Sequence, residues 1–224
     1  MALKEGTGYG FTPAKANEFL TGVKNYYKEI MNLFSQNIQK SFIDNMEYGW
    51  FTPVAVTTFQ EYVKVFNNCK NAITYHYNSV VQAINAAGQN WASNPYVNTT
   101  WSKIPFEQDD SLLNSTKIKE SIDGQYGGDI DITNTSVQNL DGIKGDIISK
   151  ISNIVATVDS YKEMFMGADQ VATLKNSLDT CGRQINTEFG KIEENIGQQV
   201  KQALQSLQQT ADQVKQSNLT TNEG

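Results

Sequence analysis

Two long stretches of this sequence place an apolar residue at every third or fourth position, and this spacing constrains the fold more than any other feature. It puts the apolar side chains on one stripe of an α-helix, and the stripe must be buried against a partner. The first stretch contains two such stripes. One comprises Ala16, Phe19, Val23, Tyr27, Ile30, Phe34, Ile38, Phe42 and Met46. The other comprises Val56, Phe59, Val63, Phe66, Ile73, Tyr77, Val80, Ile84, Ala87 and Trp91, with Lys70 as its one polar member.

Residues 48–53 separate these two helices. Gly49 ends the first pattern, and Thr52 followed by Pro53 opens the next, as Thr12 followed by Pro13 opens the first. A hydroxyl residue caps the free amides of a helix, and proline at the first helical position loses no hydrogen bond. A connection this short makes the two helices antiparallel. Residues 1–93 are therefore predicted to form a helical hairpin with its turn at 48–53.

The spacing resumes after residue 132 and indicates a second hairpin over residues 133–217. Its first stripe comprises Val137, Leu140, Ile143, Ile147, Ile151, Ile154, Val158, Tyr161 and Phe165. After a predicted turn at 165–168, its second stripe runs from Val171 to Val214, and residues 218–224 form a polar tail. The fold class is thus predicted to be all-α, with two long antiparallel helical hairpins in tandem, packed as a four-helix bundle or in a coiled-coil-like way.

Residues 94–132 lose the helical spacing and connect the hairpins. Prolines and glycines are scattered among polar residues, and residues 111–122 are the one part that could form a short helix. Trp101, Ile104 and Phe106 are large apolar residues that are costly to leave in water. We therefore expect this segment to lie across a hairpin surface rather than to act as a free spacer.

Composition argues against several function classes. The net charge is −6, so there is no basic field of the kind that attracts nucleic acid, which is not an expected partner. No segment is long and apolar enough to span a membrane, and we expect a soluble protein without a classical signal peptide. Cys69 and Cys181 are too few for a disulfide framework or zinc site, and whether they are reduced stays open.

The residues that catalysis needs are sparse. The only histidine, His76, lies between two positions of an apolar stripe and is expected at a surface or an interface rather than in a catalytic role. Asp123, Asp129 and Asp131 with Asn134 could approach a cation, but they lack the calcium-loop pattern, so a solvated loop and a helix cap are the preferred interpretation. No catalytic residue, cofactor or metal site is predicted, and the protein is expected not to be an enzyme.

Aromatic residues exceed what one stripe can bury in the first hairpin. Tyr26, Tyr48, Tyr62 and Tyr75 are candidates for a protein interface, because tyrosine combines apolar area with a polar end. Trp50 and Phe165 have two possible roles, which do not exclude each other: each plugs the end of a hairpin core, or each belongs to a docking surface for a partner.

The two hairpins look like one repeated unit. Aligning the turns places Trp50 on Phe165, Thr52 on Gly167, Val56 on Val171 and Val63 on Leu178. A helix, an aromatic-x-small turn and a second helix together resemble the WXG100 (ESAT-6-like) family of type VII secretion. Trp50-Phe51-Thr52 and Phe165-Met166-Gly167 stand at the family's Trp-x-Gly position, and each departs from it at one residue: the first lacks the Gly and the second lacks the Trp.

The resemblance implies a helical protein-interaction module that pairs with itself or with a second helical hairpin protein, associated with type VII-like secretion or its effectors. The export signal of that family, Tyr followed four positions later by Asp or Glu, is missing here: Tyr75, Tyr77 and Tyr126 are followed by Ser79, Val81 and Ile130. A different class stays open, namely a structural subunit of a phage virion. The implied location is accordingly either outside the cell by a non-classical route or in a virion.

Overall fold

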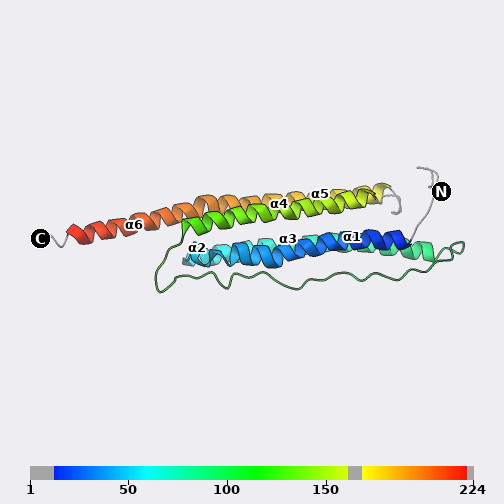
Figure 1. Cartoon of the computed structure of the whole chain (residues 1–224), viewed down its shortest axis with the longest axis horizontal. Helices are drawn as coiled ribbons and strands as arrows, with labels where there is room; N and C mark the ends of the chain where they lie inside the picture. The colour runs from blue at the N-terminus through cyan, green and yellow to red at the C-terminus, as the bar shows by residue number, and fades with distance from the viewer. Residues whose placement is uncertain (1–12, 161–167, 221–224) are drawn as a thin grey trace. The chain divides into compact units, whose positions relative to one another are not determined.

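The computed structural model describes residues 13–160 and 168–220, and it confirms the all-helical prediction: no strand is present in these ranges, and long helices pack against one another (Figure 1). The helical elements are α1 (Pro13–Asn32), η1 (Leu33–Ile43), α2 (Met46–Gly49), α3 (Pro53–Ala92), α4 (Ile130–Ser160), α5 (Ala168–Asn195), η3 (Ile196–Val200) and α6 (Lys201–Thr220). None of the helices described is long and apolar enough to cross a membrane.

The helices begin where the local chemistry favours a start. α1 begins at Pro13 and α3 at Pro53, and the Thr52 hydroxyl accepts a hydrogen bond from the Ala55 N–H at 3.1 Å. α4 begins after Asp129, whose Oδ1 accepts hydrogen bonds from the N–H groups of Asp131 and Ile132. Each of these side chains satisfies amides that a first helical turn leaves free.

η1 is a π-helical stretch in the region where one regular helix was expected. Its buried residues Phe34, Ile38 and Phe42 are each four positions apart. That step is longer than the 3.6-residue turn of an α-helix, and i→i+5 hydrogen bonds widen the turn accordingly.

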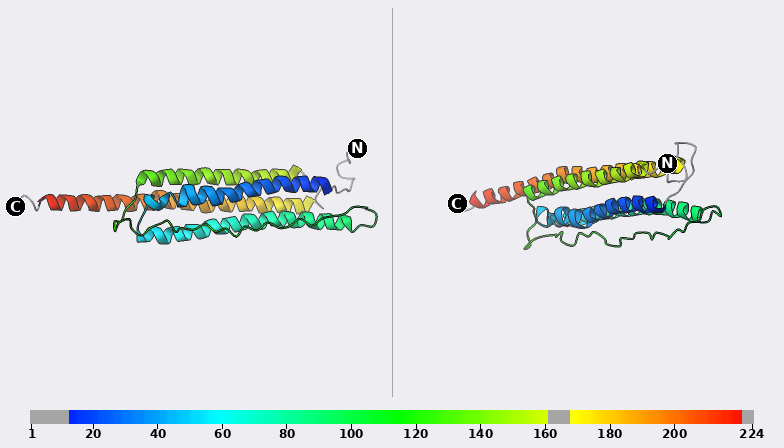
Figure 2. Two further views of the ribbon diagram at one scale, coloured as in Figure 1. Left: turned by 60° about the horizontal axis from the view of Figure 1, so that its bottom comes forward. Right: turned by 45° about the vertical axis from the view of Figure 1, so that its right-hand side comes forward.

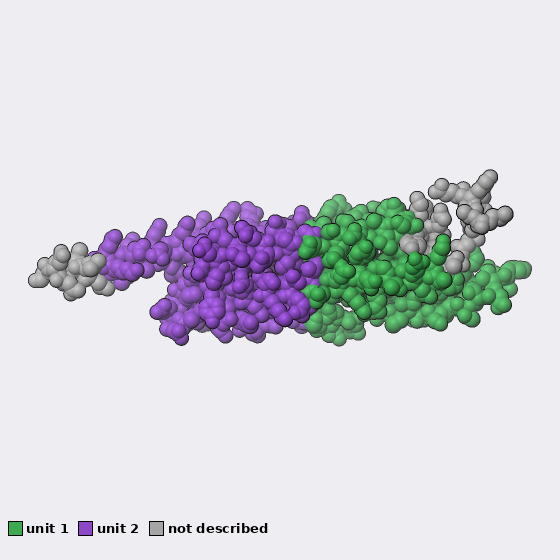
Figure 3. All heavy atoms as spheres, in the orientation of Figure 1, with its two compact units in different colours: residues 1–32, 69–111, 146–185 green, residues 33–68, 112–145, 186–224 purple. Residues whose placement is uncertain are grey.

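The chain forms two compact units, and each takes residues from several helices (Figure 3). Unit 1 contains 1–32, 69–111 and 146–185, and unit 2 contains 33–68, 112–145 and 186–224. This division differs from the sequential one into 1–93, 94–132 and 133–217, because α3, α4 and α5 each contribute to both units.

The core of unit 1 contains two stacked tyrosines of α1 and α3, together with buried residues of α4 and α5. The rings of Tyr27 and Tyr77 stack with centroids 4.4 Å apart, and the Tyr27 hydroxyl lies 3.2 Å from the Thr74 hydroxyl. α4 and α5 contribute the buried residues Ile147, Ile151, Ile154, Val158, Val171, Leu178, Cys181 and Ile185. Lys150 of α4 pairs with Glu29 of α1, so helices from both predicted hairpins meet within this unit.

The core of unit 2 contains a cluster of phenylalanine rings. Phe189 of α5 contacts Phe66 of α3 and Phe34 of η1 edge to face, at centroid distances of 4.9 and 6.2 Å. Phe42 lies 5.8 Å from both Phe59 and Phe66. All five rings are fully buried, and edge-to-face packing of this kind stabilises beyond the burial of apolar area alone.

Residues 111–122, which the sequence allowed to form a short helix, do not form one. This stretch has only a turn at 116–117 and an isolated bridge between Ile122 and Gln125. The reason lies in its main chain: the N–H and C=O groups of Leu113 and Asn114 are bound by side chains of α3 and η1. A residue held in this way cannot use the same groups in a helical hydrogen-bond ladder.

Candidate functional site

The most distinctive site in the molecule is the face of α3 that holds residues 101–118, a segment called the strap below. The strap is extended up to residue 115, and its trace follows α3 in the left view of Figure 2. The sequence led us to expect that the connecting segment lies across a helical surface, and the contacts within each unit place it there.

In unit 1, two asparagines of α3 bind the main chain of the strap. Asn85 donates to the C=O of Ile104 at 2.8 Å and accepts from its N–H at 2.9 Å. Asn78 does the same with Glu107, at 2.8 and 3.0 Å. A side-chain amide carries a donor and an acceptor side by side, so it satisfies both main-chain groups of one extended residue. We call each such pair of bonds an amide clamp.

The positions of these two clamps match the rise of helix and strap. Seven residues separate Asn78 from Asn85, whereas three separate Ile104 from Glu107. Seven helical residues rise by about 10.5 Å and three extended residues by about 10 Å, so both clamps close without strain. The later strap residue, Glu107, is bound by the earlier helix residue, Asn78. The strap therefore runs antiparallel to α3 here.

Trp101 fixes the start of the strap. Its indole N–H donates to Asn85 Oδ1 at 3.1 Å, so one buried amide oxygen accepts from both Trp101 and Ile104. The ring lies against Gly88, where a Cβ atom would stand only 2.1 Å from Trp101 Cδ2. Glycine at this position of α3 is what lets the ring approach the helix.

Lys70, the single polar member of the second stripe, lies beneath the strap. It is 1% exposed, and its Nζ lies 3.0 Å from Asp109 Oδ1 and 2.8 Å from the Ser111 hydroxyl. Burial by itself would raise the pKa of Asp109, but hydrogen bonds from Ser111 and Lys70 outweigh that effect and lower the pKa below its usual value. A buried ammonium group is tolerated here because the strap supplies its charged and polar partners.

Unit 2 repeats the amide clamp on two different elements. Asn67 of α3 binds both main-chain groups of Leu113, at 3.0 and 3.2 Å. Gln39 of η1 binds those of Asn114, at 2.9 and 3.0 Å. The strap thus passes from α3 towards η1 at these two residues, and Lys117 next pairs with Asp44 at 3.2 Å.

An open groove of about 530 Å³ lies beside these clamps in unit 2. The helical side is formed by Val56, Gln60, Val63 and Lys64, and the strap side by residues 113–116 and Ile118. Val63, Leu113 and Ile118 are buried, whereas Gln60 and Lys64 are exposed at the rim. The groove therefore has an apolar floor and a polar edge, which is the usual character of a binding groove.

The turn residues Trp50, Phe51 and Thr52 lie against the end of the connecting segment in unit 2. Trp50 is 4% exposed, and its indole N–H has no hydrogen-bond partner in the described residues. Phe51 exchanges two main-chain hydrogen bonds with Gly127, and Thr52 caps α3. Beside them, a Cβ atom on Gly128 would lie 2.2 Å from the Gly49 oxygen. We call these contacts of Gly127 and Gly128 the glycine latch.

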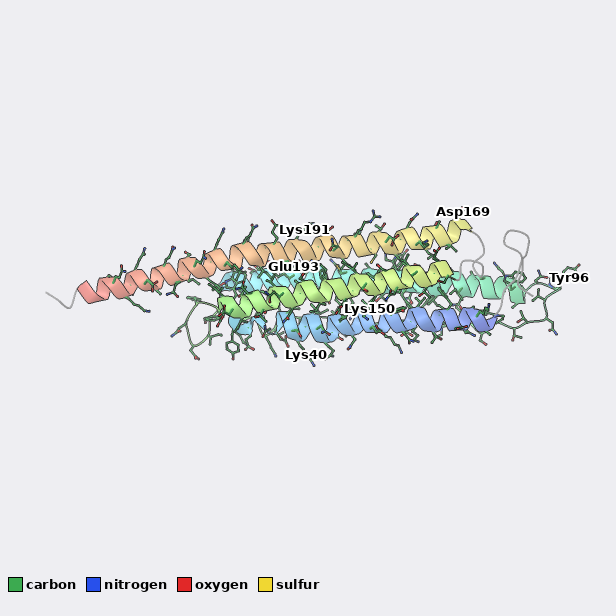
Figure 4. All side chains as sticks on the ribbon, turned by 45° about the horizontal axis from the view of Figure 1, so that its top comes forward. Lys40, Tyr96, Lys150, Asp169, Lys191 and Glu193 are labelled. Carbon is green, nitrogen blue, oxygen red and sulfur yellow. The ribbon has the colours of Figure 1, made fainter. Side chains whose placement is uncertain are left out.

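The other predicted interface residues lie in different environments. Tyr75 is 70% and Tyr48 56% exposed, whereas Tyr26 is half-buried and Tyr62 is buried. Burial raises the pKa of Tyr62 to about 12. The second turn motif, Phe165, Met166 and Gly167, lies outside the described residues. Tyr96 of the connecting segment, labelled in Figure 4, is 95% exposed.

The candidate titratable groups do not converge on one site. His76 Nδ1 lies 2.9 Å from the Ser177 hydroxyl, and burial lowers the pKa of the imidazole. Asp129 is the N-cap of α4, while Asp123 and Asp131 are exposed. Within the described ranges, no group of three or more His, Cys, Asp or Glu side chains is arranged to hold a metal ion. Cys69 and Cys181 are both buried, and burial raises the pKa of Cys181 to about 11.

The apolar stripe of the last helix leaves the core of unit 2 along α6. Val200 and Leu204 are 1% and 5% exposed, Leu207 is half-buried, and Val214 is 53% exposed. The spacing of three and four residues continues through Leu207, Ala211 and Val214. This part of α6 is therefore an amphipathic helix whose apolar face is open to solvent.

The amide clamps were not predicted from the sequence. Asn67, Asn78 and Asn85 follow one another at steps of eleven and seven residues, which keeps them on one face of α3. Asparagine is, however, also common on exposed helix faces. The one signal was the combination of that spacing with the polar residue Lys70 in an otherwise apolar stripe. Comparison with protein-family models, with curated proteins and with solved structures finds no match for this chain. The fold and site define an all-helical protein with an extended strap held by side-chain amides.

Proposed function

We propose that this chain is a non-enzymatic protein–protein interaction module that resembles WXG100 proteins and acts with a type VII-like secretion system or its effectors. In this proposal, α1 to α3 and α4 to α6 are two antiparallel helical hairpins in tandem, packed as a four-helix bundle. Contacts within both units support that arrangement, since Tyr27 of α1 stacks on Tyr77 of α3 and Lys144 of α4 pairs with Glu193 of α5 at 2.7 Å.

The open apolar face of α6 is the observation that carries the proposal. Leu207, Ala211 and Val214 extend a seam that is buried at Val200 and Leu204. An amphipathic helix with an open face gains stability by packing against another helix, because each apolar side chain removed from water contributes about 1.5–3 kcal/mol. The partner in this proposal is a helix, from a second copy or from a separate hairpin protein.

Light scattering over a wide concentration range tests the proposal. We expect a monomer of 25.0 kDa or a dimer; if a dimer forms, the double variant Leu207→Asp, Val214→Asp should convert it to a monomer of unchanged helicity. A closed ring or filament would overturn the proposal and favour a phage virion subunit, which packs the same stripes into repeated contacts. Gln205→Asp with Gln213→Asp adds the same charge to α6 away from the stripe and is the matched control.

A test of the secretion association uses a tagged full-length chain in a bacterium that carries a type VII-like system. We expect the chain in the medium only when the secretion ATPase is active and a partner with the Tyr-x-x-x-Asp/Glu signal is co-expressed. Equal amounts in the medium with and without the ATPase would contradict the association.

A further inference from the structure

The groove of unit 2 continues the face of α3 that binds the strap. Val56, Gln60, Val63 and Asn67 follow one another at steps of four, three and four residues, so they share one side of the helix. Asn67 is an amide clamp, and Gln60 stands one heptad before it with the same chemical group. The side-chain amide of Gln60 has no hydrogen-bond partner among the described residues.

The strap stops short of Gln60. About three more extended residues after Leu113 would span the rise of seven helical residues and bring the main chain to this amide. Instead, Asn114 is bound by Gln39 of η1, the chain turns at 116–117, and the Ile118 N–H donates back to the Ser115 oxygen. The face of α3 along which the strap lies therefore remains open beside Gln60. Leu113 and Ile118 form the other wall of the groove there.

We propose that this groove binds an extended segment of a partner polypeptide, with Gln60 clamping its main chain and one apolar side chain lying between Val56, Val63 and Ile118. The strap identifies the kind of ligand, since it is an extended chain held on the same face by the same group, with the Leu113 side chain buried. Recognition through main-chain atoms sets the conformation of the ligand, and the apolar floor selects a residue of aliphatic size. This binding mode is separate from helix pairing along α6.

Nuclear magnetic resonance of the uniformly ¹⁵N-labelled full-length chain tests this inference. The probe is a blocked octapeptide of alternating threonine and serine with one central leucine. We expect saturable shifts of the Gln60 side-chain NH₂ and of the Val63 and Ile118 backbone amides. Methylation of the leucine nitrogen in the peptide, which removes a main-chain donor, should weaken binding at least fivefold, and replacement of leucine by serine should do the same.

Variants of the protein separate the groove from the rest of α3. Gln60→Ala should weaken peptide binding at least fivefold without loss of helicity, because Gln60 is exposed and its side chain makes no hydrogen bond among the described residues. Gln82→Ala, a change of an exposed glutamine on the same helix, should leave binding unchanged. The inference is overturned if the peptide causes no saturable shift at millimolar concentration, or if Gln60→Ala and the methylated peptide bind as well as the originals.

Discussion

The connecting segment is attached to the helices in two ways that depend on opposite properties of its residues. In unit 1, Asn78 and Asn85 hold Glu107 and Ile104 through main-chain atoms. These bonds therefore depend on the identity of the helix residues and not on that of the strap residues. In unit 2, the glycine latch depends on the segment itself, because Gly128 approaches the Gly49 oxygen more closely than any side chain would allow. Substitutions in the strap should therefore be tolerated, whereas substitutions in the latch should not.

The largest effect is expected for Gly128→Ala. Its Cβ would meet the main chain of Gly49 at 2.2 Å and Leu204 Cδ2 at 2.7 Å, and a backbone atom cannot rotate out of the way. We expect a loss of about 3 kcal/mol in the free energy of unfolding, measured by urea denaturation.

Gly142→Ala is the matched control for the latch. Gly142 lies within α4, and a Cβ atom added there would meet no neighbouring atom within 4 Å. Alanine should therefore stabilise the helix by about 0.5–1 kcal/mol. Equal effects of the two substitutions would show that close approach is not what Gly128 provides.

The second effect concerns the clamp with the most hydrogen bonds. Asn85→Ala removes the partner of the Ile104 N–H, the Ile104 C=O and the Trp101 indole at once, in a position that is 7% exposed. Buried groups left without partners cost about 1–3 kcal/mol, so we expect a loss of about 2 kcal/mol.

Hydrogen exchange reports on this clamp directly. The Ile104 amide should exchange much faster in Asn85→Ala, and Trp101 fluorescence should shift to the red as the ring meets water. Asn90→Ala, an exposed change on the same helix, should alter neither signal. Unchanged protection of Ile104 would mean that the strap is held by packing rather than by the amide.

These differences explain which features of the fold could be predicted from the sequence. The stripe residues and the prolines at 13 and 53 indicated long helices, because burial and capping leave a local pattern in the sequence. Docking of the connecting segment was predicted from Trp101, Ile104 and Phe106, which are costly to expose, although Phe106 itself is 51% exposed. The clamps left no such pattern in the strap, since an amide that binds N–H and C=O accepts almost any residue there.

The short helix that was possible over 111–122 does not form for the same reason. Local composition permitted a helix, but it gave no sign that Asn67 and Gln39 bind the main chain of Leu113 and Asn114. Contacts of this kind join residues far apart in the sequence, so no window of neighbouring residues reports them. The role of Lys70 was hidden likewise, because its partners Asp109 and Ser111 lie in the strap.

A smaller effect is expected from Asp109, the strap carboxylate that pairs with Lys70. Because Asp109 has a lower pKa in the folded chain than its usual value of 3.8, the unfolded state takes up a proton first as the pH falls. The stability that the ionised group contributes is then fully present above about pH 5 and is lost as the pH falls through the folded pKa.

Comparison with Asp109→Asn isolates this contribution from that of the other carboxylates. The wild-type chain should be more stable than the variant at pH 7, and the gap should shrink as the pH is lowered below about 5, as measured by urea denaturation at each pH. A gap that stays constant over this range would contradict the assigned role of the Lys70–Asp109 pair.

The smallest effect should come from changing a strap side chain that faces solvent. Phe106 is 51% exposed and lies next to the clamped residue Glu107, so Phe106→Ser should change the free energy of unfolding by no more than about 0.5 kcal/mol. Glu107→Pro and Glu107→Ala are the informative contrast: both remove the ion pair between Glu107 and Lys24, but only proline also removes the N–H that Asn78 Oδ1 accepts at 3.0 Å. If the proline variant unfolds at the same urea concentration as Glu107→Ala, the clamp does not depend on the main chain, and the contrast between strap and latch no longer holds. If it is clearly less stable, attachment depends on main-chain atoms in the strap and on the absence of a side chain in the latch.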